Sequence, residues 1–149
     1  MGIVIGLNWP LEHDHSAAAI VDGKLVFVAE EERFTRHKHS ISEPPFNALY
    51  NALYFLKKEF GIKPQDISDF AINFSPYLFS KRVRKDYIMN AIKRLSLISE
   101  TSILRMSREN FFNYFFNADY SKLAYELIRA VYRKLDAPLP NNIKIHPVI

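Results

Sequence analysis

The chain has 149 residues, of which 48% are hydrophobic and 24% charged, and its formal net charge is +4. This balance is that of one soluble globular domain and excludes a disordered chain, and no apolar run is long enough to predict a membrane span. The lack of cysteine excludes disulfide bonds, thiolate zinc sites and cysteine nucleophiles, and without a signal-peptide pattern we expect a cytoplasmic protein.

Three β-strands are predicted at the start of the chain. Residues 2–8 form an apolar, β-branched run that indicates a buried strand, and residues 16–31 supply two further strands around Asp22 and Gly23. An Asp-Gly pair between apolar runs is typical of a two-residue hairpin turn, because both positions require a positive φ that these residues tolerate. We therefore expect the chain to open with a three-stranded antiparallel ribbon.

Polar residues flank this hairpin in the sequence and should meet in space. If strand pairing continues from the turn without interruption, His13 lies opposite Glu32 and His15 lies opposite Glu30. Both pairs then lie at the open end of the hairpin, roughly 20 Å from the turn at about 3.4 Å per residue. This open end is the predicted place of a functional site.

A helix and a short strand are predicted next. Pro44 and Pro45 suit the start of a helix, and Gly61 suits its end. Between them, residues spaced three and four apart predict one apolar face: Phe46, Leu49, Leu53, Leu56 and Phe60. Residues 66–75 have the pattern of a short strand, which Pro76 ends.

The remaining sequence has mostly helical patterns. The clearest apolar stripe follows a predicted helix cap at Ser121 and comprises Leu123, Leu127, Ile128, Val131 and Leu135. Residues 81–108 carry eight Lys or Arg residues against two acids, which favours a solvated helix face over a nucleic-acid surface. Residues 143–149 begin a last strand that stops unfinished. We therefore expect the front part of a longer protein, with an open sheet edge that favours a homodimer.

Two kinds of site are considered for the open end of the hairpin. Alternate strand residues share a face, so two His-x-His pairs are candidates for a zinc site without a matching carboxylate: His13, His15, His37 and His39. The alternative is an anion site, in which cations bind phosphate and carboxylates orient them: Arg33, Arg36 and Lys38 with Asp14, Glu31 and Glu32. A network of surface ion pairs with little effect on stability is the third interpretation.

An ordered set of motifs distinguishes between these interpretations. It comprises Gly-Leu-Asn at residues 6–8, His-Asp-x-Ser-Ala-Ala-Ala at 13–19, Asp-Gly at 22–23 and Glu-Glu-Arg-Phe-Thr-Arg-x-Lys-His at 31–39. The set resembles the amino-terminal segment of the carbamoyltransferases that include nodulation protein U and the antibiotic O-carbamoyltransferases. The resemblance implies an α/β fold like one half of the actin and sugar-kinase superfamily, which is ribonuclease-H-like and opens with a three-stranded antiparallel ribbon.

The resemblance and the patterns together divide the chain. Residues 1–149 are expected to be the amino-terminal part of a kinase-like domain. Within it, residues 1–76 would form the ribbon, a helix and a strand, residues 77–137 a helical insertion, and residues 143–149 the start of the next strand.

The resemblance also implies a two-stage reaction. Carbamoyl phosphate and ATP give an enzyme-bound carbamoyl adenylate, and a hydroxyl group of an acceptor then attacks it and releases AMP. Catalytic roles are implied for His13, as the base that takes the hydroxyl proton, and for Lys38, as the cation at the carbamoyl oxygen or the leaving phosphate. Substrate-binding roles are expected of four further residues: Asp14, Ser16, Glu32 and Arg36.

The resemblance also implies cofactors whose binding residues are mostly missing from this sequence. In the family a later histidine pair and later acids bind a divalent metal, expected to be iron, and the nucleotide, whereas this sequence stops at Ile149. We therefore expect neither ATP nor metal on this chain alone, and no activity from it. A stand-alone anion-binding or regulatory module and a nucleic-acid binder through residues 81–108 remain as alternatives. The expected partners are small-molecule substrates, with no membrane partner.

Overall fold

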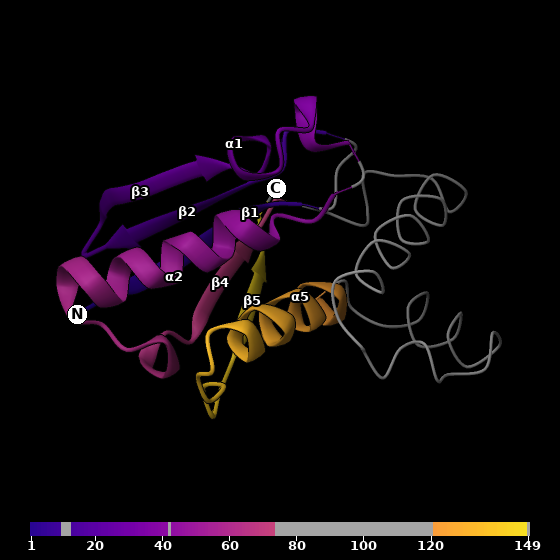
Figure 1. Cartoon of the computed structure of the whole chain (residues 1–149). Helices are drawn as coiled ribbons and strands as arrows, with labels where there is room; N and C mark the ends of the chain where they lie inside the picture. The colour runs from indigo at the N-terminus through magenta and orange to yellow at the C-terminus, as the bar shows by residue number, and fades with distance from the viewer. Residues whose placement is uncertain (10–12, 42, 74–120, 149) are drawn as a thin grey trace, which may run out of the picture.

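The structure, a computed structural model, describes residues 1–9, 13–41, 43–73 and 121–148. It is a mixed α/β fold, as the sequence predicts, with one sheet and two long helices on one of its faces (Figure 1). The strands are β1 (Ile3–Asn8), β2 (Ser16–Val21), β3 (Lys24–Glu30), β4 (Asp69–Ile72) and β5 (Lys144–Pro147). The helices are α1 (Glu32–Thr35), α2 (Phe46–Phe60) and α5 (Ser121–Lys134), with the 3₁₀ helices η1 (Lys38–Ser40) and η2 (Pro64–Asp66).

The five strands lie in the order β3-β2-β1-β4-β5. The first three are antiparallel, which confirms the predicted ribbon. β4 runs parallel to β1, and β5 runs parallel to β4. The carboxyl ends of β1, β3, β4 and β5 therefore lie at one end of the sheet, and so does the start of β2. The polar segments that follow these strands are brought together there.

The predicted hairpin turn is present. Val21 pairs with Lys24 across a two-residue turn, in which Asp22 has a φ of 47° and Gly23 a φ of 78°. Both values are positive, as this type of turn requires. The turn lies at the end of the sheet opposite to the polar segments.

The strand register beyond the turn differs from the prediction. The pairing of β2 with β3 shifts by one residue, because β3 contains an extra residue that forms a β-bulge. The prediction that His15 faces Glu30 and His13 faces Glu32 is therefore wrong. His15 lies opposite Glu31 instead, and its carbonyl accepts the Glu31 N–H at 2.8 Å. A shift of one residue exchanges the two faces of a strand, so it places the Glu31 side chain on the helix-covered face.

The core lies between the sheet and the two helices, and α2 contacts β2, β3 and α5. α2 forms where predicted and ends at Gly61, whose φ of 67° suits a left-handed cap. Its buried side chains are Ala48, Leu49, Ala52, Leu53 and Leu56. The prediction that Phe60 lies on the buried face is wrong: its side chain is 45% exposed, and its ring lies 6.0 Å from that of Phe55.

α5 and β5 also form where the sequence predicts them. The α5 side chains Leu123, Leu127, Ile128 and Val131 are buried, and the helix packs on α2 and β5. Tyr132 is buried as well, and its hydroxyl donates a hydrogen bond to the carbonyl of Pro64 at 2.7 Å. Burial raises the pKa of Tyr132, so the hydroxyl remains a donor at neutral pH.

Gly23→Ala is expected to lower the free energy of unfolding by about 1 kcal/mol, since the left-handed region disfavours a Cβ. An added Cβ would meet nothing within 4 Å at Gly23, so the cost is conformational rather than steric. Gly6→Ala is the matched control, because its Cβ would make an ordinary 3.9 Å contact with Ala18. Urea denaturation of both variants tests this. A cost as large for Gly6→Ala as for Gly23→Ala would contradict it.

The predictions for residues 74–120 lie outside the described residues. These are the helical pattern before α5 and the basic segment 81–108, and with it the nucleic-acid interpretation. The division of the chain at residues 76, 77 and 137 also stays a prediction. Among the helices that the structure describes, none has the length and apolar character needed to cross a membrane.

Candidate functional site

Two loops meet at the open end of the hairpin. Residues 13–15 lead into β2, and residues 31–41 leave β3 through α1 and η1. Four residues of these loops have left-handed φ values: Asp14 at 58°, Arg36 at 63°, His39 at 63° and Ser40 at 42°. The loops are joined through the backbone, since Asp14 N–H donates to the carbonyl of His39 at 2.7 Å. The polar residues thus meet at the open end, as the sequence predicts.

Asp14 joins two histidines. Its Oδ2 lies 2.6 Å from His13 Nδ1, and its Oδ1 lies 2.9 Å from His39 Nδ1. An ionised carboxylate can only accept hydrogen bonds, so each ring donates through Nδ1 and directs its Nε2 away from Asp14. The hydrogen bonds from His39 and His13 lower the pKa of Asp14 below its ordinary value. Asp14 is therefore ionised at neutral pH and fixes Nδ1 as the donor nitrogen of both rings.

The other two histidines are joined through Glu43. The buried His15 donates from Nδ1 to the Glu43 carbonyl, and His37 Nδ1 lies 3.3 Å from Glu43 Oε1. One histidine of each His-x-His motif therefore belongs to the Asp14 group and one to the Glu43 group. The arrangement does not bring four imidazoles together, so the zinc interpretation of these motifs is not supported.

Glu31 has a structural position that the sequence analysis missed. Its carboxylate is buried and accepts hydrogen bonds from Asn47 N at 3.1 Å, Asn47 Nδ2 at 2.6 Å and Ala48 N at 2.8 Å. The predicted role of orienting nearby cations is therefore wrong. Pro45, the residue at the start of α2, has no polar side chain, so Glu31 supplies the acceptor for the first turn of the helix. Burial raises the pKa of Glu31, and these hydrogen bonds offset the effect in part.

The other predicted site residues lie around the Asp14 group. Lys38 and Arg36 are exposed on the loop that carries His39. Glu32 Oε2 accepts the N–H of His39 at 2.7 Å, which fixes the turn at His39. Ser16 begins β2 and lines a pocket on the face of the sheet opposite to the helices. The loop N–H of His15 is bound by the hydroxyl of Ser40 at 3.0 Å.

Three of these groups could hold a metal ion. One ligand atom each from Asp14, Glu32 and His39 lie within 4.8 Å of one another. Two carboxylates and one imidazole suit a divalent ion such as iron, which would polarise a carbonyl or phosphoryl oxygen. The groups fit by donor type, and Asp14 and His39 are hydrogen-bonded to each other in this arrangement.

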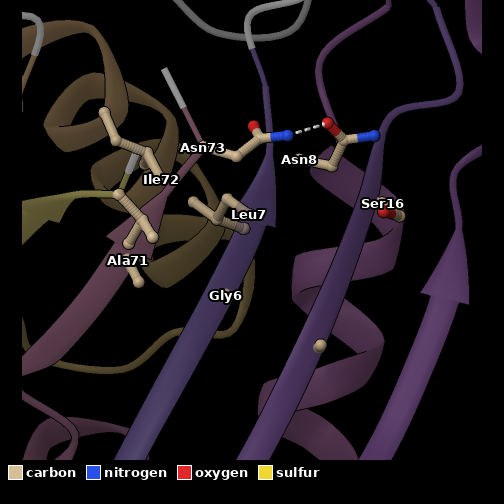
Figure 2. Close-up of a pocket in the computed structure, with 9 residues that line it drawn as sticks. Gly6, Leu7, Asn8, Ser16, Ala71, Ile72 and Asn73 are labelled. Carbon is tan, nitrogen blue, oxygen red and sulfur yellow. Dashed lines mark hydrogen bonds between the residues drawn. The ribbon is translucent and has the colours of Figure 1, made fainter. Parts of the chain in front are cut away.

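Two asparagines at the ends of β1 and β4 complete the site, and the sequence analysis assigned neither a role. Asn73 Nδ2 donates to Asn8 Oδ1 at 2.5 Å (Figure 2). Asn8 Nδ2 in turn donates to the carbonyl of Asp14 at 2.7 Å. Both line the open pocket of about 300 Å³ that also includes Ser16. The sequence indications were the place of Asn8 in the Gly-Leu-Asn motif and the position of each asparagine directly after apolar strand residues.

The sequence matches a protein-family model. The model for the amino-terminal region of carbamoyltransferases matches residues 4–138, which includes every described residue of the Asp14 and Glu43 groups. The match covers most of the sequence and agrees with the resemblance found in the motifs. The chain therefore belongs to the carbamoyltransferase N-terminus family.

Proposed function

We propose that this chain provides the acceptor-activating part of an O-carbamoyltransferase. The enzyme would form carbamoyl adenylate from carbamoyl phosphate and ATP and transfer the carbamoyl group to an acceptor hydroxyl. Membership of the family supports the transferase class. The observation that supports this part of the reaction is the contact between His13 and the ionised Asp14.

His13 has the geometry of a general base. Asp14 holds its Nδ1–H, so Nε2 carries the lone pair that would take the proton from the acceptor hydroxyl as the oxygen attacks the carbamoyl carbon. The imidazolium that forms would remain next to the Asp14 carboxylate, which stabilises its positive charge. The His13 side chain is 60% exposed, so an acceptor can reach it. Histidine suits this task because its side chain titrates near neutral pH.

Lys38 and Arg36 are proposed to bind the anionic substrates. Both are exposed cations on the loop that His39 joins to Asp14. Carbamoyl phosphate and the adenylate each carry phosphate oxygens, which lysine and arginine bind through charge-assisted hydrogen bonds. Lys38 would stabilise the charge that develops on the carbamoyl oxygen or on the leaving phosphate.

The sheet supports the proposed likeness to half of an actin or sugar-kinase domain. A three-stranded antiparallel ribbon followed by two parallel strands, in the order β3-β2-β1-β4-β5, has the topology expected for it. Ligands of open α/β sheets bind beyond the carboxyl ends of the strands. The Asp14 group lies at that end, so substrates are proposed to bind there.

The proposal is tested by measuring the two stages separately in the full-length enzyme. AMP release from ATP is expected to require both carbamoyl phosphate and a hydroxyl acceptor. Lys38→Ala should slow both adenylate formation and transfer, because the same cation serves phosphate in each stage. Lys24→Ala is the matched control, since Lys24 is an exposed lysine at the distant turn. A Lys38→Ala enzyme as active as the Lys24→Ala enzyme would remove Lys38 from the site.

A further inference from the structure

The register of the sheet brings Asn8 and Asn73 together. Leu7 pairs with Ile72 across the parallel strands β1 and β4, so the next residue of each strand lies beside the other. The two side-chain amides meet at this position, as the dashed line in Figure 2 shows. The contact therefore follows from strand pairing and does not depend on the hairpin loops.

The direction of each amide is determined by backbone groups at the two ends of the chain of hydrogen bonds. Asn73 Oδ1 accepts the N–H of Trp9 at 3.1 Å, and a backbone N–H can only donate. Asn73 must therefore present Nδ2 to Asn8, which accepts it through Oδ1. Asn8 is left with Nδ2 toward the carbonyl of Asp14, which can only accept. Neither amide can rotate by 180° without placing two donors or two acceptors together.

Both backbone polar groups of Asp14 are hydrogen-bonded. Its carbonyl is bound by Asn8 at 2.7 Å, and its N–H is bound by the His39 carbonyl at 2.7 Å. The backbone at Asp14 has a φ of 58°, a conformation that non-glycine residues rarely adopt without external support. We propose that Asn73 and Asn8 form a directional hydrogen-bond relay that positions Asp14, and through Asp14 the proposed base His13.

The effect of this positioning on the reaction rests on the proposed function. The hydrogen bonds themselves do not depend on it. Each position requires a planar group that accepts on one side and donates on the other, which only an amide supplies at this length. An aspartate at position 73 could still accept the Trp9 N–H but could not donate to Asn8. Asn8 would then rotate to donate to the new carboxylate and would turn its oxygen toward the Asp14 carbonyl.

The relay is tested with Asn73→Leu, which has a similar size, adds no charge and makes no hydrogen bond. In the chain itself, the backbone NMR chemical shifts of Asp14 should move away from the values of its left-handed conformation, because Asn8 would no longer be held in the orientation that binds the Asp14 carbonyl. In the full-length enzyme, transfer should slow by about tenfold or more while adenylate formation is kept, since small misplacements of reacting groups are costly. If Asn73→Leu fails to fold, Asn73→Asp takes its place, because the aspartate keeps the contact with the Trp9 N–H. It should slow transfer to a similar extent.

His146→Gln is the matched control. The ring of His146 hydrogen-bonds Asp69 at 3.0 Å, at the opposite end of β4 from Asn73, so this variant should leave both the backbone shifts of Asp14 and the transfer rate unchanged. A role of Asn73 in stability alone would lower the melting temperature without changing the backbone shifts of Asp14, and that result in a folded Asn73→Leu chain overturns the relay. Backbone shifts of Asp14 that change while transfer is unaffected support the relay and contradict the role of His13 as base.

Discussion

His13→Asn is expected to slow carbamoyl transfer by about a hundredfold or more, the usual size of a general-base effect, and to leave adenylate formation close to the wild-type rate. Asparagine can still donate a hydrogen bond to Asp14 but cannot take a proton at neutral pH. The loss should therefore be confined to the stage in which the acceptor hydroxyl is deprotonated. Single-turnover transfer from enzyme-bound carbamoyl adenylate, measured beside the rate of adenylate formation, separates the two stages.

The matched control is His37→Asn. His37 is an exposed histidine of the same region, but it contacts Glu43 and not Asp14. Its replacement should leave both stages near the wild-type rates. Equal loss of both stages in His13→Asn would mean that His13 binds a group common to both, and the assignment of His13 to the acceptor would then fail.

Glu31→Ala is expected to lower the free energy of unfolding by about 3 kcal/mol, because two backbone N–H groups at the start of α2 would lose their acceptor in a buried position. The other N–H groups of this first turn, on Phe46 and Leu49, are bound by the carbonyls of Pro44 and Pro45. Glu31 thus replaces the missing side-chain cap. Urea denaturation should show a lower midpoint with an unchanged slope.

Two further variants make this test specific. Glu30→Gln removes a neighbouring acid that is 48% exposed and 3.9 Å from Arg33, so its cost should be below about 0.5 kcal/mol. Glu31→Gln keeps one acceptor oxygen, so its free energy of unfolding should lie between those of Glu31→Ala and Glu30→Gln. Equal stabilities of Glu31→Ala and Glu30→Gln would show that the bonds to Asn47 and Ala48 contribute nothing.

The stability of the wild type relative to Glu31→Gln should also depend on pH. Burial raises the pKa of Glu31 in the folded state, so the folded chain binds the proton more tightly than the unfolded chain does. The contribution of Glu31 is therefore largest below the ordinary glutamate pKa of about 4.3 and declines as the pH rises through the folded value. A relative stability that increases over this range would contradict the direction of the shift.

Local chemistry was enough to predict most of the elements. The Asp-Gly turn, the apolar spacing of α2 and α5, and Gly61 as a helix cap depend on residues close together in the chain, and the structure confirms them with the exception of Phe60 in α2. The family could also be predicted from short motifs in a fixed order, because the residues of each motif are adjacent in the sequence. The sequence by itself thus determined the α/β class, the ribbon and the meeting of polar residues at the open end of the hairpin.

Only the tertiary structure decided which partner each polar residue contacts. The bulge in β3 shifted the register by one residue, and a shift of one residue moves a side chain to the opposite face. The Glu31 side chain was thereby directed to the first turn of α2, whereas Glu32 stayed beside His39. The pairing of β1 with β4 joined Asn8 to Asn73, residues 65 positions apart. Bulges and parallel pairing depend on strand packing across the whole sheet, so the residues around Asp14 could be predicted as a group but not by their contacts.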